Sequence, residues 1–230
     1  MDIVTSLVLP IALLYIVGFF IPYVIVLALF GNPRLRYIAI GALGIIPFII
    51  AQAFVQLLTY GALSHYSIWV VAPTLALIAA LFQETGKLVM IKLCKIRGRA
   101  NACGIGLGIG LLEVTLAALG IATLYLAHAQ ATSRMATMLL SATIATILAP
   151  IERLLATLFH VATVLMLYIG IIRRRLAQYY AIALTIHFIV DTLALLTLAT
   201  KSLALLVATY LILTAFDVAA LLKYAKVRIR

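Results

Sequence analysis

Long apolar runs separated by short polar breaks make up almost the whole chain. Most of these runs reach the roughly 20 residues that an α-helix needs to cross the hydrocarbon of a bilayer. The alternation of apolar and polar positions that is typical of membrane β-barrels is absent from the sequence. The pattern predicts an all-α bundle of seven membrane-spanning helices, at about residues 4–30, 37–59, 67–93, 103–128, 151–172, 178–200 and 202–223.

A shorter apolar stretch at residues 134–148 precedes Pro150. If it also crossed the membrane, the basic run 173–175 would lie on the same side as the uncharged loop 59–67. That arrangement contradicts the excess of Lys and Arg in cytoplasmic loops. We therefore expect residues 134–148 to form a half-helix or a surface helix, with the N-terminus outside and the C-terminus in the cytoplasm.

Composition supports a membrane protein. Hydrophobic residues make up 67% of the chain and charged residues 10%, and the mean hydropathy is +1.26. A globular core cannot hide this much apolar surface from water. We expect one integral domain over residues 1–230, in the cell membrane, with the lipid bilayer as its constant partner.

The net charge of +11 raises the question of nucleic acid binding. The Lys and Arg residues follow apolar runs in short blocks, which is where topology signals lie. We interpret them as signals of orientation and as contacts to anionic lipid, with no nucleic acid partner. Cys94 and Cys103 flank one basic loop and fit neither a disulfide framework nor a metal knuckle.

The acidic residues are unusual in their positions. Five of the six lie inside apolar runs: Glu84, Glu113, Glu152, Asp191 and Asp217. A carboxylate in hydrocarbon costs a few kcal/mol on insertion scales, so each one needs a partner or a function. Asp217 has no partner nearby in the sequence and is expected to be an interhelical hydrogen-bonding group.

Helix geometry predicts that four of the polar residues meet. With about 1.5 Å of rise per residue, Glu84, Glu113, His160 and His187 all lie roughly 14–18 Å from the cytoplasmic ends of their helices. We therefore predict one polar site, within residues 80–195.

Spacing along each helix predicts its local pairs. Residues three, four or seven apart share a helix face, which groups Glu84 with Lys87, His187 with Asp191, and Arg153 with His160. The first of these pairs also fits a structural ion pair near the membrane interface. Glu152 and Arg153 are adjacent and are not expected to pair, so we expect Arg153 to reach another helix.

Glycines provide a packing signal on the fourth helix. Two overlapping GxxxG pairs, Gly104/Gly108 and Gly106/Gly110, allow a neighbouring backbone to approach closely.

Four segments together resemble a known family. They are LFQETGKL around Glu84, GLGIGLLE ending at Glu113, PIERLLATLFH ending at His160, and HFIVD from His187 to Asp191. In this order, on separate helices, they resemble the YhfC family of intramembrane proteases. That family is related to PrsW and, more distantly, to the CAAX prenyl proteases.

The sequence departs from this resemblance in two places. The doubled glutamate of PrsW-like motifs is here Gln83-Glu84, and an apolar residue, Leu107 or Ile109, stands where YhfC-like sequences often have histidine. The superfamily also includes the anterior-pharynx-defective subunit of gamma-secretase, which is similar in its seven spans and late histidines and acts as a scaffold.

The resemblance implies hydrolysis of peptide bonds in membrane-embedded or membrane-delivered substrates, in a pocket open toward the cytoplasmic half of the bilayer. The expected catalytic residues are Glu84 as general base with Glu113, His160 and His187. Glu113, His160 and His187 are also candidate ligands for a divalent metal such as zinc, and we favour the version without a metal. Three charged residues are expected to support the site: Lys87, Arg153 and Asp191.

Three alternatives stay open at this point. The polar cluster also suits a non-catalytic scaffold, a proton-coupled transporter or a lipid-modifying enzyme. No internal repeat of the transporter kind is found in the sequence. Whether a water-filled cavity reaches Glu84 distinguishes a catalyst from a scaffold.

Overall fold

The computed structural model describes residues 3–128 and 136–226, and this part of the chain is helical apart from short connections. The elements are α1 (Ile3–Tyr15), the π-helical turn η1 (Ile16–Phe20), α2 (Ile21–Phe30), α3 (Leu35–Gly44), α4 (Ile46–Leu63), α5 (Ile68–Leu93), α6 (Arg99–His128), α7 (Ala136–Ile172), α8 (Leu176–Thr200) and α9 (Leu203–Ala225). Seven of the resulting spans are long and apolar enough to cross a membrane, which confirms the predicted fold class.

The first two spans are composite. The elements α1, η1 and α2 follow one another without a break, and Val8–Phe30 forms one span. The elements α3 and α4 join at Ile45, where Pro47 at the start of α4 lacks the N–H of a regular helix. The π-helical turn and the junction at Ile45 are local irregularities, and the helix continues beyond each of them. Helices continue in this way in lipid because the backbone N–H and C=O groups have to stay hydrogen-bonded.

The prediction of a separate half-helix at residues 134–148 is wrong in one respect. From Ala136 onward the segment is helical, but it continues through Pro150 into the fifth span as the single helix α7. A proline inside a transmembrane helix is tolerated where neighbouring helices and polar side chains compensate for the lost backbone hydrogen bond. The 37 residues of α7 measure roughly 56 Å, well over the ~30 Å of hydrocarbon.

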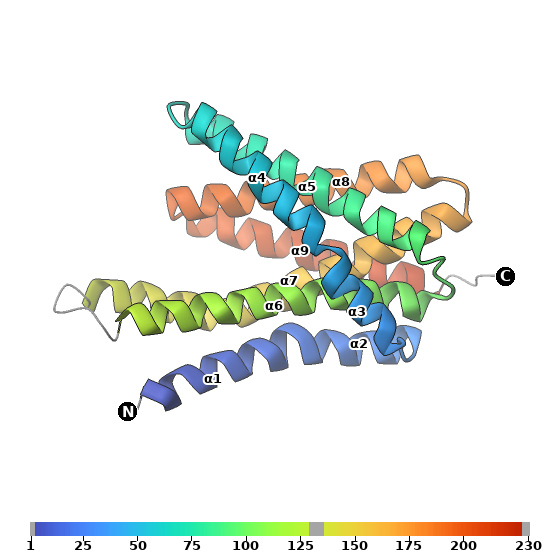
Figure 1. The fold of residues 1–230 in the computed structure, drawn as a ribbon, viewed down its shortest axis with the longest axis horizontal. Helices are drawn as coiled ribbons and strands as arrows, with labels where there is room; N and C mark the ends of the chain where they lie inside the picture. The colour runs from blue at the N-terminus through green and yellow to red at the C-terminus, as the bar shows by residue number, and fades with distance from the viewer. Residues whose placement is uncertain (1–2, 129–135, 227–230) are drawn as a thin grey trace.

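The bundle is built around α7. Within its span, Leu148–Ile172, 78% of the most apolar window is buried, against 44% in α6 and less in every other span. Figure 1 shows α6 running beside α7, with α1 and α2 on one side of this pair and α4, α5, α8 and α9 on the other. Side chains of α7 therefore face most of the other elements (α1, η1, α2, α5, α6, α8 and α9), whereas α3 packs mainly against α6, and α4 mainly against α5.

The glycines of α6 explain this close packing. Gly104 and Gly108 face α3, and a Cβ at Gly108 would overlap the backbone of Ile38. Gly106 and Gly110 face α7, and a Cβ at Gly106 would overlap the backbone of Val161. The two GxxxG pairs thus serve two different neighbours, and the predicted close approach of backbones is confirmed on both sides of α6.

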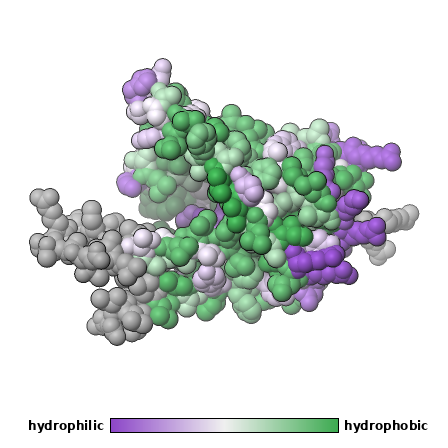
Figure 2. Space-filling model, viewed as in Figure 1, coloured by the Kyte–Doolittle hydropathy of each residue, from purple (hydrophilic) through white to green (hydrophobic). Residues whose placement is uncertain are grey.

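Most of the described basic residues gather at one end of the bundle. The α2–α3, α5–α6 and α7–α8 connections and the end of α9 lie at this basic end (Figure 1), and hydrophilic side chains mark it in Figure 2. The opposite end holds the α4–α5 and α8–α9 connections, which contain a single Lys or Arg, Lys201. The assignment of the basic end to the cytoplasm stays a prediction.

Candidate functional site

One group of polar side chains surrounds Glu84 in the interior of the bundle. The Lys87 ammonium lies 2.5 Å from Glu84 Oε1 and donates to Thr163 Oγ1 at 2.9 Å. The same carboxylate oxygen lies 2.7 Å from His187 Nδ1, and His187 Nε2 lies 3.4 Å from Asp191 Oδ2. These five residues form the Glu84 cluster, which ties α5 to α7 and α8.

The two residues at the centre of the Glu84 cluster are fully buried. The side chains of Glu84 and Lys87 have no exposed surface. The short contact between them confirms the predicted pairing of the two residues. The Lys87 ammonium also lies 5.3 Å from the ring centroid of Phe159, where the aromatic face adds a favourable cation–π contact.

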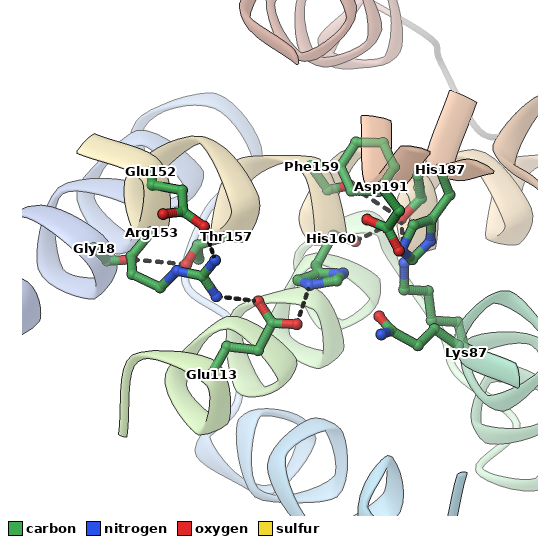
Figure 3. A network of polar contacts seen from close by, with 12 residues as sticks. Gly18, Lys87, Glu113, Glu152, Arg153, Thr157, Phe159, His160, His187 and Asp191 are labelled. Carbon is green, nitrogen blue, oxygen red and sulfur yellow. Dashed lines mark hydrogen bonds and ion pairs between the residues drawn. The ribbon is translucent and has the colours of Figure 1, made fainter. Parts of the chain in front are cut away.

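A second group surrounds Glu113. The two oxygens of this carboxylate have different partners, with His160 Nε2 3.0 Å from Oε1 and Arg153 Nη1 2.9 Å from Oε2. Arg153 Nη2 lies 2.5 Å from Glu152 Oε1. Figure 3 shows this Glu113 cluster of Glu113, Glu152, Arg153 and His160, which joins α6 to α7.

Two expectations about Arg153 have opposite outcomes. It does reach another helix, and it shares a face with His160, since both residues bind one carboxylate on α6. The expectation that adjacent Glu152 and Arg153 do not pair is wrong. A guanidinium carries five N–H donors on a long stem, so one edge reaches Glu113 while another turns back to Glu152.

The two clusters meet at their histidines. The ring centroids of His160 and His187 are 6.2 Å apart, and the ring of Phe159 contacts both of them edge-on (Figure 3). The structure thus brings together the four polar residues that helix depth places at one level. Glu84 and Glu113 have no direct contact with each other and belong to separate clusters.

A cavity of about 210 Å³ opens beside the histidines. Its polar wall contains Glu113, Arg153, His160, His187, Asp191 and Gln83. Neither Glu84 nor Lys87 lines it. A volume of this size holds several water molecules. The cavity therefore borders the Glu113 cluster and His187, but not Glu84, the residue that the sequence predicts as general base.

The cavity extends in the opposite direction from the one expected. Beyond the polar wall it is lined by Thr197 and Leu198 near the end of α8 and by Leu206 and Tyr210 near the start of α9. These residues lie toward the end of the bundle opposite the basic loops. The cavity therefore extends away from the basic end, between the last turns of α8 and the first turns of α9. The two predictions, a cytoplasmic basic end and an opening toward the cytoplasmic half, do not hold together.

One nitrogen of His160 has no partner among the described residues. His160 is 3% exposed, its Nε2 binds Glu113, and its Nδ1 is buried without a hydrogen bond. In Figure 3 the imidazole directs one nitrogen to Glu113 and the other away from it, toward the side of His187 and Asp191. His187 differs in this respect, since each of its nitrogens faces a carboxylate.

The predicted ligand set does not fit a metal in this arrangement. Within the described ranges, no three His, Cys, Asp or Glu side chains are grouped so that they could hold an ion. His160 Nε2 is directed at Glu113, and His187 is directed at Glu84 and Asp191. Zinc requires donor atoms about 2.0–2.2 Å from one shared point, whereas the two histidines are paired with carboxylates and Glu113 is held by His160 and Arg153.

Several residues of the site are absent from the sequence prediction. Thr163 receives the Lys87 hydrogen bond, and Thr157 donates to the carbonyl oxygen of Gly18 at 2.7 Å. Both threonines lie three residues from His160, a spacing that places each of them next to His160 on the surface of α7. Asp217, by contrast, is 2% exposed and neither of its oxygens has a partner in the described part of the chain, so the interhelical hydrogen bond expected of it is not formed with these residues.

Comparisons of the chain with protein-family models, with curated proteins and with solved structures give no match. The resemblance to the YhfC family therefore rests on the four sequence segments alone.

Proposed function

We propose that this multi-pass membrane protein is an intramembrane peptidase in which Glu113 and His160 activate a water molecule. The observation that carries the proposal is the state of His160, which lines a cavity with room for water: a carboxylate holds one of its nitrogens, and the other, Nδ1, is buried without a partner among the described residues. The substrate is a membrane-embedded or membrane-delivered polypeptide, because the cavity lies within the spans of the bundle.

The arrangement suits general base catalysis. When ionised Glu113 accepts a hydrogen bond from Nε2–H of a neutral imidazole, the other nitrogen, Nδ1, carries the lone pair. Nδ1 of His160 takes a proton from water while the water oxygen attacks the carbonyl carbon of the peptide bond. The same nitrogen returns the proton to the leaving amine as the C–N bond breaks. Arg153 holds the second oxygen of Glu113 and so fixes the orientation of the pair.

Glu84 takes a different role from the one the sequence predicts. It lies outside the cavity wall, and one of its oxygens contacts both Lys87 and His187. We propose that Glu84 positions His187 and holds α5 against α7 and α8. His187 in the cavity wall, between Glu84 and Asp191, would then add positive charge near a developing oxyanion whenever its imidazole is protonated.

The proposed orientation follows from the basic residues. If the basic end faces the cytoplasm of a cell membrane, the cavity reaches toward the outer half of the bilayer. The substrate then enters from that half, through the region where α8 and α9 line the cavity.

The proposal is tested by cleavage of a transmembrane reporter peptide by the purified protein in liposomes. Removal of a general base costs about 10²- to 10⁴-fold in rate, so His160→Gln is expected to lose at least about 10²-fold. His65→Gln is the matched control, because His65 is exposed on the α4–α5 connection, outside the cavity. Wild-type rates in His160→Gln, with normal thermal stability, would contradict the proposal.

A scaffold is the second candidate, and the burial of the Glu84 cluster favours it. Polar side chains that are paired with each other and buried away from water can hold helices together without any catalytic role. A scaffold predicts that wild type leaves every transmembrane reporter intact, while His160→Gln lowers thermal stability.

A further inference from the structure

A chain of three glutamines leads from α4 to the cavity wall on α5. Gln56 Nε2 donates to the backbone oxygen of Leu75 at 2.9 Å, and Gln52 Nε2 donates to Gln56 Oε1 at 3.2 Å. Gln83 Nε2 then donates to Gln52 Oε1 at 3.2 Å. Gln83 lines the cavity, whereas Gln52 and Gln56 do not.

The direction of this chain is fixed at its far end. A backbone carbonyl only accepts hydrogen bonds, so Gln56 has to turn its amide nitrogen to Leu75 and its oxygen to Gln52. Because Gln56 offers its oxygen, Gln52 donates with its nitrogen and offers its own oxygen to Gln83, which in turn donates with its nitrogen. Gln83 therefore directs its nitrogen toward α4, and its Oε1 receives no hydrogen bond from the described residues. The cavity wall on α5 thus carries an oriented, neutral acceptor.

Hydrolysis within a membrane creates a need for such an acceptor. In hydrocarbon a polypeptide pairs its backbone groups within a helix, and water cannot attack a carbonyl that is shielded in this way. Opening the helix frees N–H groups, and each unpaired group costs several kcal/mol in an apolar environment. A site that cleaves an opened segment has to offer these N–H groups a new partner.

We propose that Gln83 is a substrate-positioning residue whose side-chain oxygen accepts a hydrogen bond from a backbone N–H of an opened polypeptide segment. The inference rests on the proposed function and names the form in which the substrate is bound. It sets Gln83 on α5 and His160 on α7 to act on one segment in the same cavity. Selectivity then depends on a free N–H group, which an N-methylated backbone lacks.

The test compares the affinities of two fluorescent transmembrane peptides for the full chain in nanodiscs, in the His160→Gln background, which keeps the peptides intact. One peptide has an unmodified backbone, and the other carries N-methyl groups beside the scissile position. A hydrogen bond of about 1 kcal/mol corresponds to roughly a fivefold ratio of affinities. This ratio is expected to fall to about one when Gln83→Leu is added.

Two further variants separate the acceptor from general packing. Gln83→Glu keeps an oxygen acceptor in the wall and is expected to preserve the ratio. Gln56→Leu breaks the same hydrogen-bond chain away from the cavity, and it is expected to lower the ratio only part of the way, because Gln83 keeps its oxygen but is no longer held in one orientation. An equal ratio with and without Gln83→Leu, or no binding of the unmodified peptide, would overturn the inference. A different outcome is also informative: the protein binds the unmodified peptide more tightly than the N-methylated one, while the form with native His160 cleaves neither. That result would overturn the proposed peptidase and leave the role of Gln83 standing.

Discussion

At the scale of single residues, the buried ammonium of Lys87 shows how the interior balances charge. It has no exposed surface and is held by Glu84, Thr163 and the ring of Phe159. An unpaired charge at this position would be strongly unfavourable in a medium of low dielectric constant. The partners of Lys87 therefore set the stability of the contact between α5 and α7.

Lys87→Met is expected to destabilise the protein by about 3–5 kcal/mol, because it leaves the Glu84 carboxylate buried without its cation. The double variant Lys87→Met/Glu84→Gln is expected to recover most of this loss, since no net charge then remains at the pair. Thermal unfolding in detergent measures both effects. A single variant as stable as wild type would show that the pair contributes nothing.

The sequence predicts which residues form the site better than it predicts what each residue does. Depth along a helix depends only on the rise per residue, so Glu84, Glu113, His160 and His187 could be placed at one level. Which of them meets water depends on how each helix is rotated against its neighbours. Glu84 faces α7 and α8 while Glu113 lines the cavity. A single amino-acid sequence carries no signal for how each helix is rotated about its axis.

At the scale of elements, α6 is positioned by residues that have no side chain. Its alternate glycines let α3 and α7 approach on two faces. The length of the apolar runs and the GxxxG spacing predicted this helix and its packing. Pro150 misled the prediction of α7, because a proline ends most helices in water but only perturbs one that is surrounded by other helices.

Gly106→Ala and Gly120→Ala form a matched pair on α6. The first places a methyl group against the backbone of Val161, whereas the second meets nothing within 4 Å. Gly106→Ala is expected to lower the free energy of unfolding by about 1–3 kcal/mol through overpacking. Gly120→Ala is expected to be neutral or to stabilise by up to about 1 kcal/mol, through helix propensity. Equal thermal shifts for the two variants would contradict the close approach of α6 and α7.

At the scale of the whole molecule, the basic loops and the cavity lie toward opposite ends of the bundle. If the basic end is cytoplasmic, the cavity reaches toward the outer half of the membrane. The sequence contains no pattern that predicts toward which end of the bundle the cavity extends. It results from the way α8 and α9 pack against α5 and α7 near the α8–α9 connection.

Single cysteines test this orientation. Cys94→Ser removes the partly exposed native thiol, and Cys103 is buried. In that background His65→Cys is expected to react with an impermeant maleimide on intact cells. Arg175→Cys, at the exposed α7–α8 connection, is expected to react only after permeabilisation. The reverse pattern would invert the topology and place the cavity toward the cytoplasm.

The central claim is that Glu113, through His160, activates water in the cavity and that Glu84 does not. The most direct measurement is the initial rate of reporter cleavage by Glu113→Gln and by Glu84→Gln, at a temperature where both variants are folded. The account predicts a loss of at least about 10²-fold for Glu113→Gln and less than about tenfold for Glu84→Gln. A large loss for Glu84→Gln with near-normal cleavage by Glu113→Gln would contradict it and restore Glu84 as the base.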